Sequence, residues 1–314
     1  ELAKINRDAG DERDICLKNS ASLRLCGEKL LEKSNEFDGI IDYLEINSRH
    51  IVMPLKTQTL PPATHTNCFI IGRKEFIVID AASTEVEEQE KLHRLIDQLL
   101  SRGGNCKEII VSHLHNDHHG GEIALKNHLK SKGFDVPIST HRMTAEKLTH
   151  IDFDKFIEDG DIYKLQDENG KPFQLQTLHT PGHARGLLNF YDEEFGFLLS
   201  TDNVVGAGTV VIAPPEGNMS DYLQTLNRLK SLPNLKHLCG SHGSAIFDAK
   251  TKIEQYISHR LQREKQIIEL LDQGLKTPEE LVEKIYINLK SELVHLAIKS
   301  VEAHLEKIEQ DKIS

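Results

Sequence analysis

His113-Leu114-His115-Asn116-Asp117-His118-His119-Gly120-Gly121 is the stretch of sequence that decides the fold. Four histidines and one aspartate occupy seven consecutive positions, and two glycines follow. Only Ser112 separates it from the apolar run Ile109-Ile110-Val111, which predicts a short buried strand. Imidazole nitrogens beside a carboxylate suit zinc, or manganese or iron in looser geometry. The stretch therefore predicts a metal-binding loop at a strand end rather than a polar surface loop with incidental histidines.

Three more candidate ligands follow predicted strands later in the chain. His183 ends the run Thr180-Pro181-Gly182-His183, Asp202 follows the apolar run 197–201, and His242 stands beside a glycine. One loop cannot surround an ion, so a metal site needs ligands from several elements. Side chains just past several strands can meet at one rim of a sheet, and we expect the cluster there.

The order of these pieces is more specific than any one of them. The pattern HxHxDH, then TPGH, then an aspartate at a strand end, then GxHG, resembles the metallo-β-lactamase superfamily over roughly residues 51 to 246. The resemblance implies an α/β fold, a four-layer αββα sandwich with a metal pair at one edge.

The resemblance also implies a role for each candidate residue. It assigns His113, His115 and His183 to a first metal ion. It assigns Asp117, His118 and His242 to a second ion, and Asp202 to a bridge between the two. The expected cofactor is zinc, two ions per chain, with manganese or iron as alternatives. A water or hydroxide between the metals would be the nucleophile, because zinc lowers the pKa of bound water to about 7. Asp117 is also the candidate catalytic residue, because it could orient the hydroxide or carry a proton to the leaving group.

The other histidines are expected to have lesser roles. We expect His119 to lie beside the ligands or to be exposed, and His179 to form a local hydrogen bond. No chemical role is expected for four further histidines: His65, His141, His150 and His304.

Composition and charge limit the classes of protein. At 314 residues, with 38% hydrophobic residues, the chain can hold a core domain of about 200 residues with appendages. No run of about 18 apolar residues and no signal-like segment occurs, so we expect no membrane span and no membrane partner. Five cysteines, an odd number, suggest reduced thiols rather than a Cys16–Cys26 pair. The expected location is intracellular, either cytoplasmic or in the mitochondrial matrix.

The chain divides into three expected parts: residues 1–48 as an N-terminal extension, 49–247 as the catalytic domain and 248–314 as a helical domain. The extension contains a helix-like segment at 23–31. In the catalytic domain a hairpin is expected over 64–80, with helices over 84–100 and 222–232. In the last part, helices are expected over 253–271 and 291–308. Thr277-Pro278-Glu279-Glu280 predicts a capping box with proline at the first helical position.

The last part narrows the resemblance. The run 253–260 (IEQYISHR), followed by 263–267 (REKQI), is similar to the beta-lactamase-like protein 2 group of the glyoxalase II-like branch. The resemblance implies a C-terminus like a winged helix, here partial because the chain ends at Ser314. Animal members of that group are endoribonucleases of the mitochondrial matrix that act on single-stranded RNA.

Several functions follow from these patterns. The first is a metal-dependent hydrolase that acts as an endoribonuclease on single-stranded RNA. The alternatives are a thioester, ester or lactone hydrolase of the glyoxalase II type, a persulfide dioxygenase with one iron, and a binding module without activity. The net charge of −11 does not favour nucleic acid, although a local basic groove would be compatible with it. The segment 206–219 departs from the group's pattern, so the sequence leaves the substrate open, as it does the oligomeric state.

Overall fold

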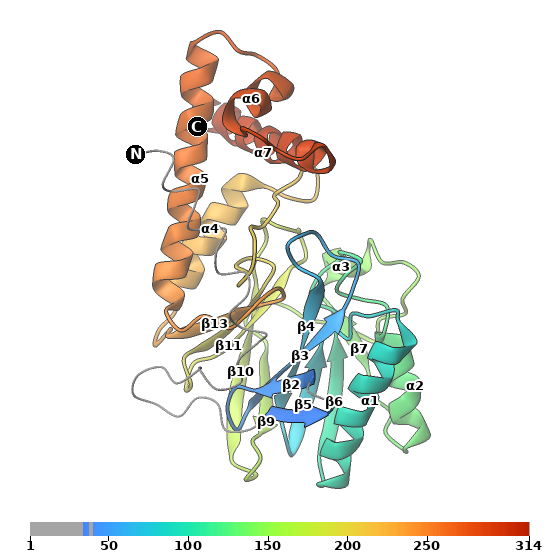
Figure 1. The fold of residues 1–314 in the computed structure, drawn as a ribbon. Coiled ribbons are helices and arrows are strands. Elements are labelled where there is room, and N and C mark those ends of the chain that lie inside the picture. The colour runs from blue at the N-terminus through green and yellow to red at the C-terminus, as the bar shows by residue number, and fades with distance from the viewer. Residues whose placement is uncertain (1–33, 38–39, 314) are drawn as a thin grey trace.

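The computed structural model describes residues 34–37 and 40–313 (Figure 1). The helix expected over 23–31 and the thiols of Cys16 and Cys26 lie outside these residues. In the part described, Cys68, Cys106 and Cys239 are buried free thiols.

The described strands form one hydrogen-bonded network that folds into two facing halves. The halves are linked by the pairing of Glu75 with Gln166, between β5 and β9. The first half contains β1 (Ser34–Phe37), β2 (Ile40–Glu45), β3 (His50–Lys56), β4 (His65–Gly72), β5 (Glu75–Ile79), β6 (Asn105–Ile110), β7 (Ile138–Thr140) and β8 (Lys155–Phe156). The second contains β9 (Ile162–Gln166), β10 (Pro172–His179), β11 (Leu188–Asp192), β12 (Phe197–Thr201) and β13 (His237–Gly240).

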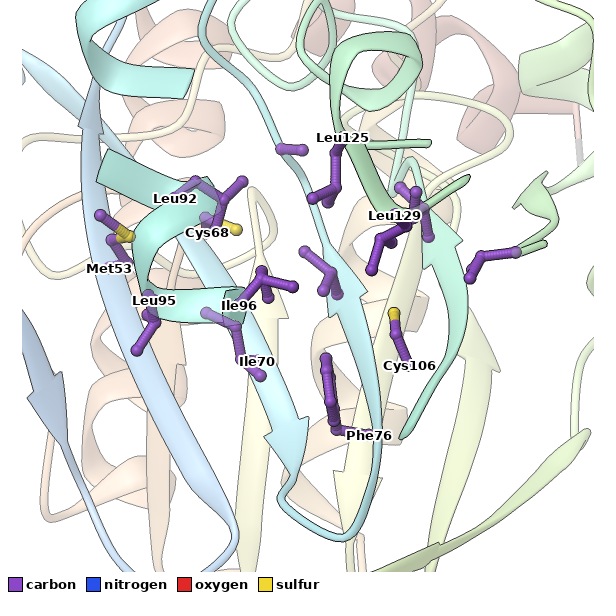
Figure 2. Packing of buried hydrophobic residues seen from close by; sticks show 14 of the residues in the cluster. Met53, Cys68, Ile70, Phe76, Leu92, Leu95, Ile96, Cys106, Leu125 and Leu129 are labelled. Atoms are coloured by element: carbon purple, nitrogen blue, oxygen red, sulfur yellow. The ribbon is translucent and has the colours of Figure 1, made fainter. Parts of the chain in front are cut away.

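The alternation of side chains along β4 explains the layers. Successive residues of a strand point to opposite faces of the sheet. Cys68 and Ile70 belong to the core that lies under the helices of the first half (Figure 2). Phe69 and Ile71 belong to the core between the two halves, together with side chains such as Phe190 of β11. Both faces of the sheet are therefore buried, which explains the continuous apolar run along β4.

Helices cover the outer face of each half. On the first half lie α1 (Val86–Ser101) and α2 (Glu122–Ser131), and α1 buries Leu92, Leu95 and Ile96 against the sheet (Figure 2). On the second half lies α4 (Met219–Lys230), which packs with the start of α5 (Ala249–Asp272). A short α3 (Arg142–Ala145) follows β7. The order helix, sheet, sheet, helix is the αββα sandwich that the resemblance implies.

The last part of the chain is helical, as expected. After α5 come α6 (Pro278–Ile285), a 3-10 turn (Ser291–Leu293) and α7 (Val294–Ile313), which lie beside the end of α5 (Figure 1). Side chains of α5, α6 and α7 form a separate small core. The capping box is present, because the Thr277 hydroxyl accepts from the Glu280 N–H and the Glu280 carboxylate accepts from the Thr277 N–H.

Two further features bear on the organisation of the chain. Strand β2 pairs with β3, with Leu44 opposite Val52, so the sheet reaches into the segment before residue 49. The division at residues 48 and 247 stays a proposal. Within the described residues, no helix combines the length and the apolar composition needed to cross a bilayer.

Candidate metal centre

The loop with the first four candidate ligands follows β6, as predicted, and its first candidate ligand stands three residues after the end of this strand. Ser112 and His113 follow the end of this strand, and the Gly120-Gly121 pair leads into α2. Glycine is required at Gly121, because a Cβ there would lie 2.2 Å from the Ala81 carbonyl oxygen. The turn that aims the histidines therefore depends on close packing of backbone against backbone.

The first three ligands of the prediction are brought together. The donor nitrogens of His113, His115 and His183 all lie within 4.8 Å of one another. His115 Nδ1 is 2.9 Å from the Nε2 atom of His113 and 2.9 Å from that of His183. Ligands bound tetrahedrally to zinc at about 2.0–2.1 Å would lie roughly 3.3 Å apart, so these nitrogens need to separate only slightly to hold an ion.

The second set of three is brought together as well. Donor atoms of Asp117, His118 and His242 also lie within 4.8 Å of one another. Asp117 Oδ2 is 3.4 Å from His242 Nε2, and Asp117 Oδ1 is 3.7 Å from His118 Nε2. We call these three residues the second triad, and His113, His115 and His183 the first triad.

The Asp202 carboxylate lies between the two triads. Its Oδ2 atom is 3.5 Å from His118 Nε2, 3.6 Å from His183 Nε2 and 3.4 Å from His242 Nε2. The Asp202 Oδ1 atom and the His118 Nε2 atom are buried without a hydrogen-bond partner among the described residues. Buried polar atoms are normally paired, so these unpaired atoms fit a site that takes a metal ion.

Hydrogen bonds on the outer ring nitrogens turn the imidazoles toward the centre. His183 Nδ1 lies 2.8 Å from the Val211 carbonyl oxygen, and His242 Nδ1 lies 3.0 Å from the His65 carbonyl oxygen. An N–H that donates to a carbonyl leaves the other ring nitrogen unprotonated and able to bind a metal. His65, expected to have no role, thus contributes through its backbone.

Asp80 is a residue of the candidate site that the sequence reasoning missed. It follows β5 in the left-handed region (φ 57°) and is fully buried. Its carboxylate accepts from the Ser112 N–H and hydroxyl, at 2.7 Å each, and lies 2.9 Å from His118 Nδ1. The signal was present in the sequence, because an acidic residue ends the apolar run 76–79.

Asn67 is a second residue to which the sequence reasoning gave no role. Its side-chain amide donates to the carbonyl oxygens of Gly240 and Gly243, at 2.9 Å each, and its N–H donates to the Ser241 carbonyl oxygen. These contacts hold the backbone on both sides of His242.

The two triads differ in their electrostatics. Burial lowers the pKa of His113 and His183, and lowers that of His115 to about 3. Burial acts in the same direction on His118, but the negative charges of Asp202 and Asp80 together outweigh it and raise the pKa of His118 well above its usual value. The first triad is therefore neutral, which is the form that binds a cation.

The histidines of the second triad and the Asp202 carboxylate shift one another's pKa values. Against the effect of burial, a hydrogen bond and the charge of Asp202 raise the pKa of His242. In return, the charges of His118 and His242 hold the pKa of Asp202 well below its usual value, although burial opposes this. The carboxylate is thus kept ionised in a buried place, as a metal ligand must be.

The comparisons with known proteins agree with this geometry. Residues 61–242 match the family described as the metallo-beta-lactamase superfamily. The chain belongs to the metallo-β-lactamase superfamily. Residues 277–313 also match the beta-lactamase associated winged helix domain, in agreement with the resemblance of the last part.

Individual members of the superfamily cover much of the chain. The Beta-lactamase-like protein 2 homolog of Caenorhabditis elegans is 25% identical over 79% of this chain and 80% of its own length. An atrochrysone carboxyl ACP thioesterase of Pseudocercospora fijiensis is 28% identical over 68% of this chain. The match spans only 58% of that thioesterase's length.

Solved structures of superfamily members have the same fold. A beta-lactamase domain protein from Burkholderia ambifaria aligns with a TM-score of 0.73 at 16% identity, over 86% of this chain and 88% of its own. A metallo-beta-lactamase family protein from Thermus thermophilus aligns with a TM-score of 0.65 at 20% identity, over 84% and 94%. Family and fold together make the chain a hydrolase of the metallo-β-lactamase superfamily, with a cluster of histidines and aspartates that could hold metal ions.

The other histidines mostly lie outside this cluster. His119 is buried beside the ligands, 5.6 Å from the His150 ring, and belongs to none of the three donor groups among the described residues. His179 has the local hydrogen bond predicted for it, to the Arg185 carbonyl oxygen at 2.7 Å, and stacks on His141.

Proposed function

We propose that this member of the metallo-β-lactamase superfamily is a dinuclear zinc hydrolase in which the first triad holds one ion, the second triad holds the other and Asp202 bridges them. The observation that carries the proposal is the position of Asp202 Oδ2, 3.4 to 3.6 Å from nitrogens of both triads. Two separate triads with one shared carboxylate support two ions better than one.

The bound ions would supply a water acidified to a pKa of about 7 and the positive charge that a polarised substrate oxygen needs. The residues of the chain bind and orient. The first triad is neutral and lends no charge, while Asp117 and Asp202 bring the negative charge that keeps two dications together. Asp117 is the catalytic residue we propose: its carboxylate oxygens lie 3.7 Å from His118 Nε2 and 3.4 Å from His242 Nε2, where the side chain could orient the hydroxide or carry a proton to the leaving group.

The substrate class we propose is an acyl thioester or a related ester. Relatives named as thioesterases support it, because two of them align with 68% and 78% of this chain. The net charge of −11 also fits a small substrate better than a polyanion. Hydrolysis of a thioester adds water across the carbonyl–sulfur bond and releases a carboxylic acid and a thiol.

Cleavage of single-stranded RNA is the second candidate. It is favoured by the last part of the chain, which matches the beta-lactamase associated winged helix domain, and by similarity to a Beta-lactamase-like protein 2 homolog over most of both chains. The same ligands can serve attack at phosphorus, so the choice depends on the walls of the site.

A side-by-side assay tests both. Zinc-loaded protein and its Asp117→Ala variant would be given a panel of acyl thioesters and lactones and, separately, labelled single-stranded RNA. We expect turnover of thioesters that the variant loses. RNA cleavage alone, lost in the variant and weakened by salt, would reverse the order. Metal analysis that finds one iron per chain, with oxidation of a persulfide, would replace the hydrolase by a dioxygenase.

A further inference from the structure

The segment Asp202–Val211, which we call the bridging segment, is connected to three of the seven proposed ligands. It begins with Asp202 itself. It ends at Val211, whose carbonyl oxygen lies 2.8 Å from His183 Nδ1 and so sets the orientation of that imidazole. A shift of the bridging segment would therefore move a ligand of the first triad and the carboxylate between the triads together.

The middle of the bridging segment holds the third ligand. The N–H groups of Gly206 and Ala207 donate to the His242 carbonyl oxygen, at 2.7 and 3.1 Å. The approach is so close that a Cβ on Gly206 would lie 2.3 Å from the Ser244 carbonyl oxygen. His242 is thus tied to the same ten residues as Asp202 and His183.

Helix α5 contacts the bridging segment at two points. The Tyr256 hydroxyl lies 3.3 Å from the Val205 nitrogen and 3.2 Å from the Val205 carbonyl oxygen. One helical turn later, Arg260 Nη2 donates to the Val210 carbonyl oxygen at 2.5 Å. Residues four apart share one face of a helix, so both contacts come from the same face of α5 and together fix the bridging segment.

The arginine is built into the protein rather than resting on its surface. Arg260 is 4% exposed, and its guanidinium lies over the Tyr222 ring at 5.4 Å, within the range of a cation–π contact. The Tyr222 hydroxyl in turn donates to the Asn203 carbonyl oxygen at 2.6 Å, next to Asp202. The Arg260 guanidinium therefore contacts both the bridging segment and the Tyr222 ring that supports this segment.

We infer that Arg260 is a positioning residue of the metal centre: with Tyr256, it fixes the bridging segment and through it the geometry of His183, Asp202 and His242. The helical part of the chain would thereby determine how tightly the sandwich holds its metal. This inference rests on the metal site of the proposed function but on neither choice of substrate.

Zinc affinity, measured by competition with a chromophoric chelator, tests the inference without any assay of activity. We expect Arg260→Met to weaken zinc binding by about 10- to 100-fold, the range seen when partners of ligands are removed. Arg260→Lys keeps a donor for the Val210 carbonyl and should recover much of the loss. Tyr256→Phe removes only a hydroxyl and should give a smaller loss in the same direction.

The control is Arg263→Met, which removes an arginine of the same helix that contacts Tyr286 and Gln266 instead of the bridging segment. Equal losses in Arg260→Met and Arg263→Met, or wild-type affinity in a folded Arg260→Met protein, would overturn the inference. If Arg260→Met does not fold, Tyr256→Phe decides by the same criterion. A wild-type protein that binds no metal would instead refute the proposed function.

Discussion

The two halves of the sandwich contribute to the centre in different ways. The first half supplies His113, His115, Asp117 and His118 from one loop, held in place by its own glycines and by Asp80 from the neighbouring strand. The second half supplies His183, Asp202 and His242 from three loops. The bridging segment connects these loops, and α5 holds the bridging segment in place. Ligands close in sequence need only a turn, whereas dispersed ligands need contacts from elsewhere in the fold.

The largest effect is expected where the two halves meet. Asp202→Ala removes the carboxylate shared by both triads, whose Oδ2 atom lies 3.4 to 3.6 Å from nitrogens of His118, His183 and His242. We expect the loss of one metal ion and a fall in activity of at least about 100-fold, beyond what loss of an outer partner causes. The control is Asp152→Ala, which removes an exposed carboxylate outside the cluster, and the metal content and turnover of the two variants should be compared. If the Asp202→Ala protein kept two ions, the assignment of Asp202 as the bridging ligand would be wrong.

A change in the first triad should separate the two metal positions. His115→Ala leaves Asp117, His118 and His242 intact, so one ion should remain while activity is lost. Equilibrium dialysis followed by elemental analysis would measure the stoichiometry. If His115→Ala protein kept both ions, the assignment of this imidazole as a ligand would be wrong.

Asp80 orients a ligand in the first half of the sandwich, and the effect of replacing it can be compared with that of replacing Arg260. Asp80→Asn replaces a carboxylate oxygen by a donor that cannot accept the His118 N–H, so His118 should lose its orientation. We expect zinc affinity to fall by about 10- to 100-fold, in a competition titration with a chelator. The second triad alone should weaken, so a loss confined to the first triad would contradict the contact between Asp80 and His118.

The helical part contains a buried histidine unlike those of the centre. His304 is fully buried, and burial, reinforced by the charges of Arg260 and Arg263, lowers its pKa to about 3. Among the other groups near it are Lys307, His259 and the Glu264 carboxylate, 3.8 Å away. A histidine that is neutral when folded takes up a proton on unfolding below pH 6.5, so stability is lost as the pH falls from 6.5 toward 3.

Replacing this histidine therefore has a defined signature. Wild-type protein should lose up to about 1.4 kcal/mol of unfolding free energy more per pH unit than His304→Leu below pH 6.5. Urea unfolding of metal-free protein at pH 7.5, 6 and 5 would measure it, because the histidines of the metal centre are the same in both proteins. Parallel pH curves would show that His304 does not contribute.

The smallest effect is expected at the histidine next to the ligands. His119→Ala should change zinc affinity by no more than about twofold, as for a residue outside the site. His118→Ala is the matched comparison and should lose the second triad's ion. The reverse result would mean that the register of the loop is shifted by one position.

Much of this protein could be predicted from its sequence, because local patterns have local physical causes. Apolar runs on either side of a turn located the hairpin over β4 and β5, the 3.6-residue period located helices such as α1, and the capping box located the start of α6. Ligand residues at strand ends predicted that seven side chains would meet at one edge of the sheet. The superfamily followed from the order of the motifs.

What only the tertiary structure decided were contacts between residues far apart in the chain. Nothing in the sequence near His183 indicates that its outer nitrogen lies against the Val211 carbonyl, or that Arg260 holds the neighbouring carbonyl of Val210. Asp80 is marked in the sequence as an acidic residue at the end of an apolar run, but only the fold shows that its carboxylate lies against His118. Sequence determines which groups are available as ligands, whereas their orientation depends on backbone carbonyls and carboxylates that only the folded chain brings within hydrogen-bonding distance.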